Sequence, residues 1–366
     1  MVTTFAPTRC GIGSFAASLS NALGGQGVEV DVVRLLQTGD VPGSSSRVSM
    51  EFDPSRTTSV TRASKVLDRY PTVIVQHEFG IFGPSDGEAA ADLAEAVSSQ
   101  VVTVLHSVPL RPEPLKRRIV ARLAKASSLV VPSHAARVAL EDLYGVPAET
   151  VAVIPHGSSW SPTELNSGPR RRLLTWGLLG PGKGVERGIA AVDKLGDLFA
   201  DGLRYSIVGQ THPNVVRREG FRYRETLERL ISYRRLEGVV TLDEGYKTDA
   251  DLYRVVAAAD VIVIPYDNDE QICSGVLTEA VAAGKPVVAT KFPHATELLG
   301  GGAGLVVGHE DPGEMANAIR MLLTDEMAYQ RAVGRARLAS SRLAWSEVAR
   351  RYREYFARLS DSLAVS

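Results

Sequence analysis

Short runs of β-branched and other apolar residues alternate with helical patterns along most of this 366-residue chain. The runs are continuous and do not alternate with polar residues, which is typical of strands covered on both faces. Strands that alternate with helices predict an α/β fold with parallel, doubly wound sheets. The expected strands are Val2–Phe5, Val28–Leu35, Thr72–Val75, Val101–Leu105, Ser128–Val131, Val151–Ile154, Leu173–Gly177, Tyr205–Val208, Val239–Leu242, Val261–Ile264, Pro286–Ala289 and Gly304–Val306. The expected helices are Gly13–Leu23, Glu88–Ser98, Pro114–Lys125, Ala135–Tyr144, Glu186–Lys194, Glu225–Glu237, Leu252–Ala259 and Gly313–Leu323.

The alternation breaks near residues 160–169, in a polar stretch rich in Ser, Pro and Gly that is typical of a linker. A chain of this length is comfortable for two domains. We therefore predict one domain over residues 1–165 and a second over residues 166–344. The first expected strand is short, so either the natural start lies upstream or the strand is truncated. Ligands of open α/β sheets bind beyond the carboxyl ends of the strands, and the residues that follow each strand are the candidates for function.

Charge and composition exclude several classes of protein. The chain has 41 Lys and Arg against 42 Asp and Glu, so it lacks the basic excess of a nucleic-acid-binding protein. Two cysteines, Cys10 and Cys273, form neither a disulfide framework nor a metal-binding pattern, and they indicate a reducing, cytoplasmic compartment. No apolar run is long enough to span a membrane, and the N-terminus does not have a signal-peptide pattern. A peripheral contact with a membrane surface and the oligomeric state stay open.

A glycine-rich turn follows the first expected strand. Residues Gly11 to Ala16 read G-x-G-x-x-A, a pattern of dinucleotide-binding sites. Two features count against a nicotinamide cofactor: Ala6–Cys10 separates the strand from the first glycine, and Arg34–Gln37 offers no acid for a ribose. A tight loop that enters a helix is the structural alternative. We favour a loop that closes over a sugar phosphate.

Polar residues follow three further strands of the first half. His77 and Glu78 stand together after one strand, and such a pair can handle hydroxyl groups or simply cap the next element. His106 follows the next strand, where a structural and a catalytic role are about equally plausible from the sequence. His156 ends the first domain, and we interpret it as a hinge residue.

The second half opens with a strand, a glycine-rich loop and a lysine before a helix. Lys183 in this loop can neutralise a phosphate as a point charge, although a solvated loop lysine is the alternative. The loop is not of the Walker type, because no Ser or Thr follows Lys183.

The most informative segment lies between residues 266 and 290. Ser274 is a favoured N-cap residue and Gly284 is a favoured helix terminator. The N-terminus of the helix between them carries free N–H groups and the positive end of the dipole, so it can bind a diphosphate without a metal. An ordinary capped helix explains Ser274 and Gly284, but not Glu279 inside an apolar helix. A carboxylate at that place suits a ribose hydroxyl pair.

Seven segments jointly resemble the retaining GT-B glycosyltransferases of family 4, also called group 1, over nearly the whole chain. They are PTRCGIGSF, QHEFGIFG, IPHG, GLLGPGKG, VGQTHPNVVRREG, FPHATELL and Gln271 with SGVL. The family hallmark is a pair of glutamates eight residues apart. Glu279 matches the second glutamate, whereas Gln271 replaces the first, with Glu270 beside it; a subgroup seems to share this variant.

A second departure concerns the cations of the family. Lys183 matches the family lysine in the loop after the first strand of the second domain, but Leu178 stands where an arginine is usual. Arg9, His212 and His294 are the candidates for the missing positive charge.

The resemblance implies two Rossmann-like domains that face a cleft, with residues 345–366, and in particular Trp345–Leu359, as a helix that returns to the first domain. It implies metal-independent, retaining transfer of a hexose to a hydroxyl of a saccharide or glycolipid acceptor, as in polysaccharide biosynthesis. Mannose from GDP-mannose is the first expectation, and glucose from UDP-glucose or ADP-glucose is the alternative. No cofactor beyond the nucleotide sugar is implied, and the expected location is the cytoplasm or the inner face of the membrane.

Other functional classes stay open beside this reading: a nucleotide-sugar epimerase, an NAD-dependent dehydrogenase and a non-catalytic sugar-nucleotide binder.

The resemblance also assigns roles to residues. The departing phosphate would accept the proton of the acceptor, so catalysis would rest on positioning and on stabilising the leaving diphosphate. The expected catalytic residues are His106, Lys183, Gln271 and Glu279. The expected donor-binding residues are Gly11, Gly13, Lys183, Gly209, Tyr246, Gln271, Ser274, Gly275, Val276, Leu277 and Glu279. The expected contacts to the acceptor or sugar are Arg9, His77, Glu78 and His106.

Overall fold

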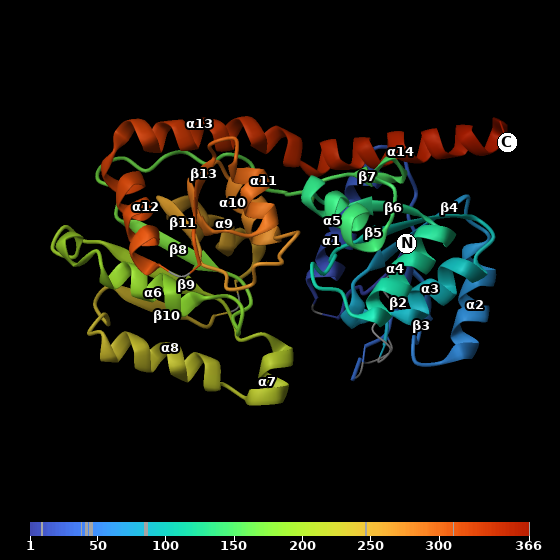
Figure 1. The fold of residues 1–366 in the computed structure, drawn as a ribbon, viewed down its shortest axis with the longest axis horizontal. Helices are drawn as coiled ribbons and strands as arrows, with labels where there is room; N and C mark the ends of the chain where they lie inside the picture. Colours follow the sequence, from blue (N-terminus) through green and yellow to red (C-terminus); the bar gives the residue numbers. More distant parts are fainter. Residues whose placement is uncertain are drawn as a thin grey trace. The chain divides into compact units, whose positions relative to one another are not determined.

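The computed structural model describes residues 1–8, 10–37, 39–40, 43, 47–83, 87–245, 247–309 and 311–365. The chain folds into two compact units (Figure 1). The first unit comprises residues 1–157 together with residues 345–366, and the second comprises residues 158–344. Each unit contains a parallel, Rossmann-like sheet, as the alternation of strands and helices predicted.

The first unit is built on a seven-stranded parallel sheet of order β3-β2-β1-β4-β5-β6-β7. Its strands are β1 (Val2–Thr3), β2 (Val32–Leu35), β3 (Val48–Phe52), β4 (Thr72–His77), β5 (Gln100–Leu105), β6 (Ser128–Val131) and β7 (Val151–Val153). Its helices are α1 (Gly11–Gly24), α2 (Thr57–Leu67), α3 (Glu88–Ala96), α4 (Pro114–Ala126), α5 (His134–Tyr144) and α14 (Trp345–Val365), with short 3-10 helices η1 (Phe79–Ile81) and η2 (Ala148–Thr150).

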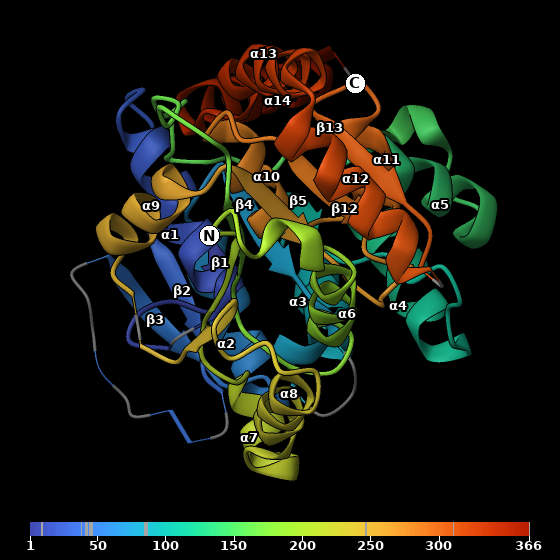
Figure 2. The ribbon, with the colours of Figure 1, turned by 90° about the vertical axis from the view of Figure 1, so that its left-hand side faces the viewer.

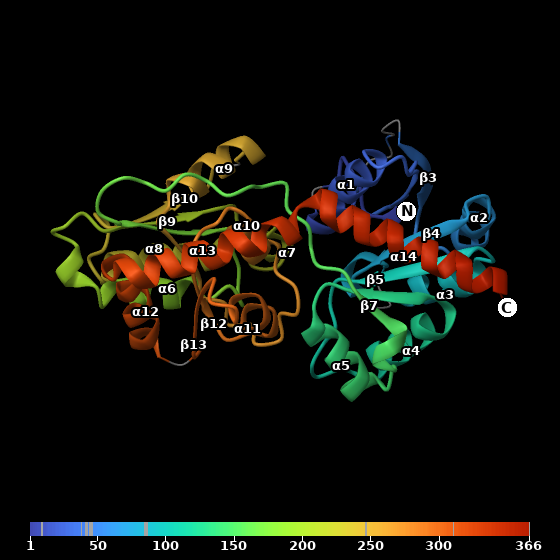
Figure 3. The same cartoon turned by 90° about the horizontal axis from the view of Figure 1, so that it is seen from above.

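The end of the chain returns to the first unit, as the resemblance implied. Helix α14 lies along this unit in Figure 3 and packs against α1. Val348, Ala349 and Tyr352 of α14 are buried in one apolar cluster with Phe15 and Leu19 of α1. The last helix is therefore part of the core of the first unit.

The second unit has a six-stranded parallel sheet of order β10-β9-β8-β11-β12-β13, of which β12 and β13 are labelled in Figure 2. Its strands are β8 (Arg172–Trp176), β9 (Arg204–Val208), β10 (Val240–Asp243), β11 (Val261–Ile264), β12 (Val287–Thr290) and β13 (Gly304–Val307). Its helices are α6 (Val185–Asp193), α7 (Pro213–Glu219), α8 (Arg222–Tyr233), α9 (Asp249–Ala258), α10 (Gly275–Ala282), α11 (Pro293–Leu299), α12 (Pro312–Thr324) and α13 (Glu326–Leu343), with a 3-10 helix η3 (Gly196–Leu198).

Successive residues of these strands face two separate apolar clusters, one on each side of the sheet. Val261 and Val263 of β11 pack with α6, α8 and α12, whereas Ile262 and Ile264 pack with α9, α10 and α11. Because both faces are covered, every position in such a strand is apolar. The polar segment 158–169 belongs to this unit, and Thr163 N donates to Ala283 O at 3.0 Å.

Both sheets reverse their strand order once. The reversal lies between β1 and β4 in the first sheet and between β8 and β11 in the second. Doubly wound sheets bind ligands at the carboxyl edge beside such a reversal. The segments that follow β1, β4, β8 and β11 are therefore the places to look for a site, and they carry the candidate motifs of the sequence.

Several elements differ from the sequence-based prediction. The first strand is only Val2–Thr3, and β2 begins at Val32 where Val28 was expected. The prediction did not include β3, which lies at the edge of its sheet, and whose residues alternate between buried and exposed positions, unlike the continuous runs elsewhere. It also did not include the helices α2, α7, α11 and α13. With seven residues each, α7 and α11 carry too little periodicity to be recognised, whereas α2 and α13, with 11 and 18 residues, are long enough to show it.

Candidate active site

Three segments meet at the carboxyl edge of the second sheet. Gly177 follows β8 with a φ of 121°, and Gly209 follows β9 with a φ of 150°. A Cβ atom on Gly209 would lie 1.9 Å from the carbonyl oxygen of Gly177, so only glycine fits there. A Cβ atom on Gly177 would lie 3.3 Å from a methyl group of Val276, at the start of α10. The two glycine turns and the N-terminus of α10 are therefore in close contact.

The loop that carries Lys183 is held against the segment after β11. Gly184 has a φ of 57°, and a Cβ atom there would lie 1.8 Å from the carbonyl oxygen of Pro265. Asp267 N donates to Gly182 O at 3.1 Å. The Nζ atom of Lys183 lies 4.2 Å from the centroid of the Tyr266 ring. No carboxylate of the described residues forms an ion pair with Lys183, so its charge is available to an anion.

The N-terminus of α10 has both occupied and open amides. Ser274 is the N-cap, as predicted, and its Oγ accepts from Leu277 N at 3.2 Å. Ser274 N donates to Nδ1 of His294 at 3.0 Å. The amides of Gly275 and Val276 have no hydrogen-bond acceptor among the described residues. The four residues from Ser274 to Leu277 were expected to contact the donor. Two of their backbone amides are used inside the protein, and two stay open.

Glu279 lies further along the same helix in an enclosed position. Burial raises the pKa of Glu279 to about 7, against the effect of a hydrogen bond from the side chain of Trp176, while the charge of Asp249 adds to the rise. The Trp176 indole packs beside Trp160, with ring centroids 5.8 Å apart. At neutral pH this carboxyl group is therefore divided between its neutral and ionised forms.

Gln271 has a local role in the loop before α10. Its Nε2 donates to the carbonyl oxygen of Cys273, and its Oε1 accepts from Nδ2 of Asn268 at 3.3 Å. Its own carbonyl oxygen accepts from His294 N at 3.3 Å. The side-chain amide of Gln271 thus closes the loop in which it stands.

Two of the candidates for the missing positive charge are histidines that accept hydrogen bonds. Nδ1 of His294 accepts from Ser274 N, and Nδ1 of His212 accepts from Asn214 N at 3.0 Å. Partial burial, together with the positive charges of Lys183, Arg217 and Arg218, lowers the pKa of His212 below its ordinary value. A neutral imidazole cannot supply the charge. The third candidate, Arg9, and the expected base contact Tyr246 both lie outside the described residues.

The carboxyl edge of the first sheet carries neutral histidines. His106 donates from Nε2 to Oε1 of Gln76 at 2.7 Å, because an amide oxygen only accepts. Burial, with the neighbouring His156 and His77, lowers the pKa of His106 to about 3. His77 is fully buried, its pKa is lowered to about 4, and neither ring nitrogen has a partner among the described residues. Both imidazoles are therefore uncharged at neutral pH.

Glu78 follows His77 in the chain, and its surroundings disfavour the charged form of its carboxyl group. Burial raises the pKa of Glu78, although the backbone amides of Gly80 and Phe79 and the nearby charge of Lys116 act in the opposite direction.

An aromatic cluster fixes His106 from one side. The Phe15 ring centroid lies 4.7 Å from that of His106, 5.0 Å from that of His156 and 5.0 Å from that of Trp345. His156 donates from Nδ1 to Gly157 O at 2.7 Å, and a Cβ atom on Gly157 would lie 2.3 Å from the Trp345 ring. These contacts stand where the chain leaves the first unit and where it returns.

The two glycines of the first turn differ from each other. A Cβ atom on Gly13 would lie 3.2 Å from Thr4 O, so Gly13 lets α1 pack against the end of β1. A Cβ atom on Gly11 would meet nothing within 4 Å. Close packing explains Gly13, while Gly11 has no such explanation.

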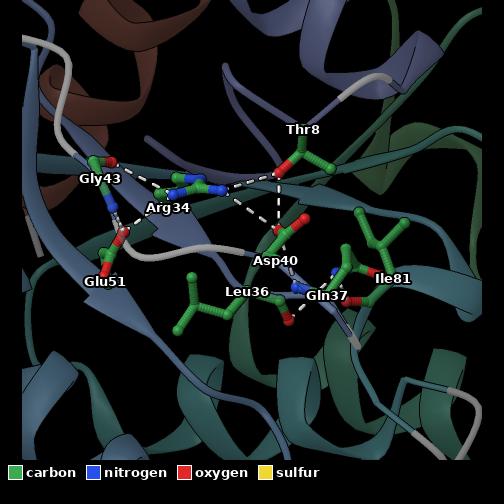
Figure 4. A network of polar contacts seen from close by, with 8 residues as sticks. All are labelled: Thr8, Arg34, Leu36, Gln37, Asp40, Gly43, Glu51 and Ile81. Carbon is green, nitrogen blue, oxygen red and sulfur yellow. Dashed lines mark hydrogen bonds and ion pairs between the residues drawn. The ribbon is translucent and has the colours of Figure 1, made fainter.

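A buried arginine ties together the loops of this edge (Figure 4). Arg34, at the end of β2, is fully buried and pairs with Glu51 at 2.8 Å and with Asp40 at 3.3 Å. The Thr8 hydroxyl donates to the same oxygen of Asp40 at 2.7 Å, and Gln37 donates to a carbonyl oxygen of η1 at 2.9 Å. From the sequence, this segment shows only that no acid directly follows the strand. A lone arginine inside a β-branched run was the available signal for this network.

The described residues contain no group of three or more His, Cys, Asp or Glu side chains placed to hold a metal ion. None of the helices within them is long and apolar enough to cross a bilayer.

Comparison with known proteins gives consistent matches. A family model described as glycosyltransferase family 4 matches residues 10–158, and one described as glycosyl transferases group 1 matches residues 170–325. The curated D-inositol 3-phosphate glycosyltransferase of Xylanimonas cellulosilytica is 36% identical over 110 residues, which are 30% of this chain. The match spans only 25% of that relative's length.

Solved structures match over nearly the whole chain. HepE of Anabaena, in complex with UDP, has a TM-score of 0.77 at 18% identity and covers 98% of this chain and 99% of its own. The sucrose-phosphate synthase of Thermosynechococcus elongatus has a TM-score of 0.78 at 19% identity, with 99% and 98% covered. HepE has also been solved with UDP-glucose. At these identities the likeness establishes the shared GT-B fold.

Proposed function

The chain belongs to the group 1 glycosyltransferases, glycosyltransferase family 4, and from this premise we propose that it moves a hexose from a nucleotide sugar to a hydroxyl of a saccharide or glycolipid. We further propose that transfer retains the anomeric configuration and needs no metal ion. The observation that carries the proposal is the meeting of Gly177, Gly209 and the open amides of α10 beside Lys183 and Glu279. Small residues, free N–H groups and an unpaired cation are what a diphosphate requires.

In this proposal the leaving diphosphate is stabilised without a metal. The amides of Gly275 and Val276 and the ammonium group of Lys183 face the charge that develops as the bond between the sugar and the phosphate oxygen breaks. Donors that are fixed before the reaction are the largest source of rate enhancement in such sites. Glu279 accepts hydrogen bonds from the ribose hydroxyl pair, and it does so best in its ionised form.

The acceptor binds at the carboxyl edge of the first sheet. Because Nε2 of His106 donates to Gln76, its Nδ1 is the nitrogen that can accept from a hydroxyl of the acceptor or sugar. An imidazole with a pKa of about 3 is a poor base. The acceptor oxygen bonds to the anomeric carbon, the bond to the diphosphate breaks, and the acceptor proton passes to the departing phosphate oxygen.

The Q-x-x-S-G sequence at Gln271 is proposed to mark a subgroup of the family. Since the Gln271 amide closes its own loop, the subgroup would hold the transferred sugar with neutral groups instead of a charged glutamate. The donor is proposed to be GDP-mannose, as the sequence resemblance suggested, or UDP-glucose, which the HepE complex favours. We place the reaction in the cytoplasm, with a glycolipid acceptor presented at the inner face of the membrane.

Thermal unfolding with GDP, UDP, ADP, GDP-mannose, UDP-glucose and NAD, each with and without EDTA, tests the proposal. A ligand at a hundred times its Kd adds about 2.7 kcal/mol. Each kcal/mol raises Tm by about 2–4 °C for a domain of this size. We expect a rise with one nucleoside diphosphate and its sugar, unchanged by EDTA. No rise with any of them, or a rise with NAD alone, would overturn the proposal. Product analysis without an acceptor separates a transferase from an epimerase.

A further inference from the structure

The loop after β8 brings a single positive charge to the proposed diphosphate site. Leu178 is 41% exposed, and Lys183 is the one cationic residue between Gly177 and Gly184. His212 and His294 are acceptors of backbone hydrogen bonds, so they do not replace the missing charge. The inference below rests on the proposed function and concerns where the remaining charge comes from.

Helix α7 is fastened directly to this loop. Leu179 N donates to Gln210 O at 2.8 Å, and His212 N donates back to Leu179 O at 2.8 Å. A Cβ atom on Gly180 would lie 3.0 Å from a methyl group of Val215, in the first turn of α7. The helix therefore packs against the glycine-rich loop that leads to Lys183.

Helix α8 also contacts the segments around the glycine-rich loop. The Tyr223 hydroxyl donates to Glu186 at 2.8 Å, beside the start of α6. Arg224 is buried, pairs with Glu244, and donates to the carbonyl oxygen of Gly209 at 3.4 Å. Both glycine turns of the candidate site are thus tied to the α7–α8 pair, which is labelled in Figure 1.

Two cations of α7 lack a carboxylate partner. Arg217 and Arg218 are exposed in the last turn of α7, and no carboxylate of the described residues pairs with either. Among the described residues, Arg217 donates only to the amide oxygen of Asn214, at 2.5 Å. In α8, Arg229 pairs with Glu225, whereas no carboxylate of the described residues pairs with Arg222.

The unpaired charges of α7 also act at the same place as Lys183. The pKa of His212 is lowered first by burial and then by Lys183, Arg217 and Arg218. All three cations thus lie near one side chain, His212, which is the N-cap of α7.

We propose that Arg217 and Arg218, together with Lys183, form the cationic clamp for the donor's diphosphate and replace the arginine that is absent at Leu178. The two arginines reach the site from a neighbouring helix instead of from the loop itself. The plain alternative is that cations in a last helical turn only stabilise the dipole of α7. That alternative predicts a change in folding stability without a change in phosphate binding.

Calorimetric titration of the double variant Arg217→Ala/Arg218→Ala tests the clamp. The ligands are UDP or GDP, whichever the unchanged protein binds, and the matching nucleoside. We expect binding of the diphosphate to weaken about tenfold or more, because charge-assisted hydrogen bonds are lost. Binding of the nucleoside should not change. The control Arg222→Ala/Arg229→Ala removes the same charge from exposed positions of α8 and should bind the diphosphate normally.

A rescue variant makes the test sharper. Leu178→Arg, added to the double variant, places a cation in the loop after β8 and should recover most of the lost affinity for the diphosphate. Equal binding by the double variant and the unchanged protein would overturn the clamp, and so would an equal loss for nucleoside and diphosphate. If the unchanged protein binds no nucleotide at all, the proposed function fails before the clamp is tested.

Discussion

The carboxyl edges of the two sheets come from the same architecture but differ in how their charges are used. At the edge of the second sheet, Lys183 has no carboxylate partner among the described residues, and two amides of α10 are open. At the edge of the first sheet, the buried cation Arg34 is enclosed by Asp40 and Glu51. The histidines there are uncharged at neutral pH.

This difference assigns a ligand type to each edge. An edge with free positive charge suits an anion such as a diphosphate, and an edge with neutral imidazoles suits uncharged hydroxyl groups. A parallel sheet therefore sets the place of a site, and the residues after its strands set the charge of the ligand. Four changes, ordered from the largest expected effect to the smallest, test this comparison.

Removing the free cation of the second unit should have the largest effect. We expect Lys183→Ala to lower kcat about 100–1000-fold, because it takes away charge that stabilises the leaving diphosphate. The measurement is release of nucleoside diphosphate from the donor, beside a thermal melt that checks the fold. Lys194→Ala, an exposed lysine at the end of α6, is the matched control. Near-normal turnover of Lys183→Ala would remove this residue from the site.

Removing the enclosed cation of the first unit should affect folding instead of the charge of a ligand. Arg34→Ala leaves Asp40 and Glu51 without their partner in a largely buried place, so we expect a loss of about 2–4 kcal/mol in the free energy of unfolding of this unit. Hydrogen exchange of the β1 and β2 amides reports this unit alone. Arg62→Ala, on the exposed side of α2, should change little. Unchanged protection in Arg34→Ala would show that the network is not stabilising.

Replacing His106 should affect the function of the first sheet's edge and leave that of the second sheet's edge unchanged. We expect His106→Ala to lower transfer to methyl glycosides about 100-fold, because an orienting acceptor is lost from the first unit. The Kd for UDP or GDP should stay the same, since donor binding belongs to the second unit. His134→Ala, at an exposed position on α5, serves as the control. Weaker nucleotide binding by His106→Ala would contradict the division of roles.

The smallest effect concerns the pH dependence of stability through Glu279. Its folded-state pKa is raised from 4.5 to about 7, so between these values the folded protein holds a proton that the unfolded chain releases. Stability therefore falls as pH rises through this window, and the loss is complete above about pH 7. We compare the free energy of unfolding of Glu279→Gln with that of the unchanged protein. As pH rises from 5 to 8, we expect the difference to shift by about 2 kcal/mol in favour of the variant.

Thermal melts at the two pH values measure this difference, and Glu164→Gln, an exposed acid of the same unit, should show none of it. A gain that is the same at pH 5 and pH 8 would contradict the assigned titration. In the unchanged protein, affinity for the nucleoside diphosphate should rise as pH crosses 7, because the ionised carboxylate is the better ribose acceptor.

Most of the fold could be predicted from the sequence because its signals are local. The strands Ser128–Val131 and Val261–Ile264 are found with the predicted bounds, since continuous apolar runs mark strands that are covered on both faces. Ser274 as N-cap and Gly284 with its positive φ are equally local. The edge strand β3 and the seven-residue helices α7 and α11 lack a pattern of that kind, and only tertiary packing stabilises them.

The missed parts of the candidate site depend on contacts between distant segments. Ser274 meets His294 across 20 residues, and Arg34 meets Glu51 across 17. Arg217 and Arg218 gain their significance only because α7 packs on the loop around Gly180. Sequence patterns identify residues that suit a chemical task, whereas pairing between strands and loops decides which of them are already engaged.

The position of α14 also has a consequence for how the protein is made. Val348, Ala349 and Tyr352 complete the apolar cluster that begins with Phe15, so the first unit encloses its core only after the last helix has left the ribosome. The second unit, residues 158–344, is a contiguous segment and is synthesised before that helix. Domains fold as units during synthesis. The half that is translated first is therefore the half whose core is completed last.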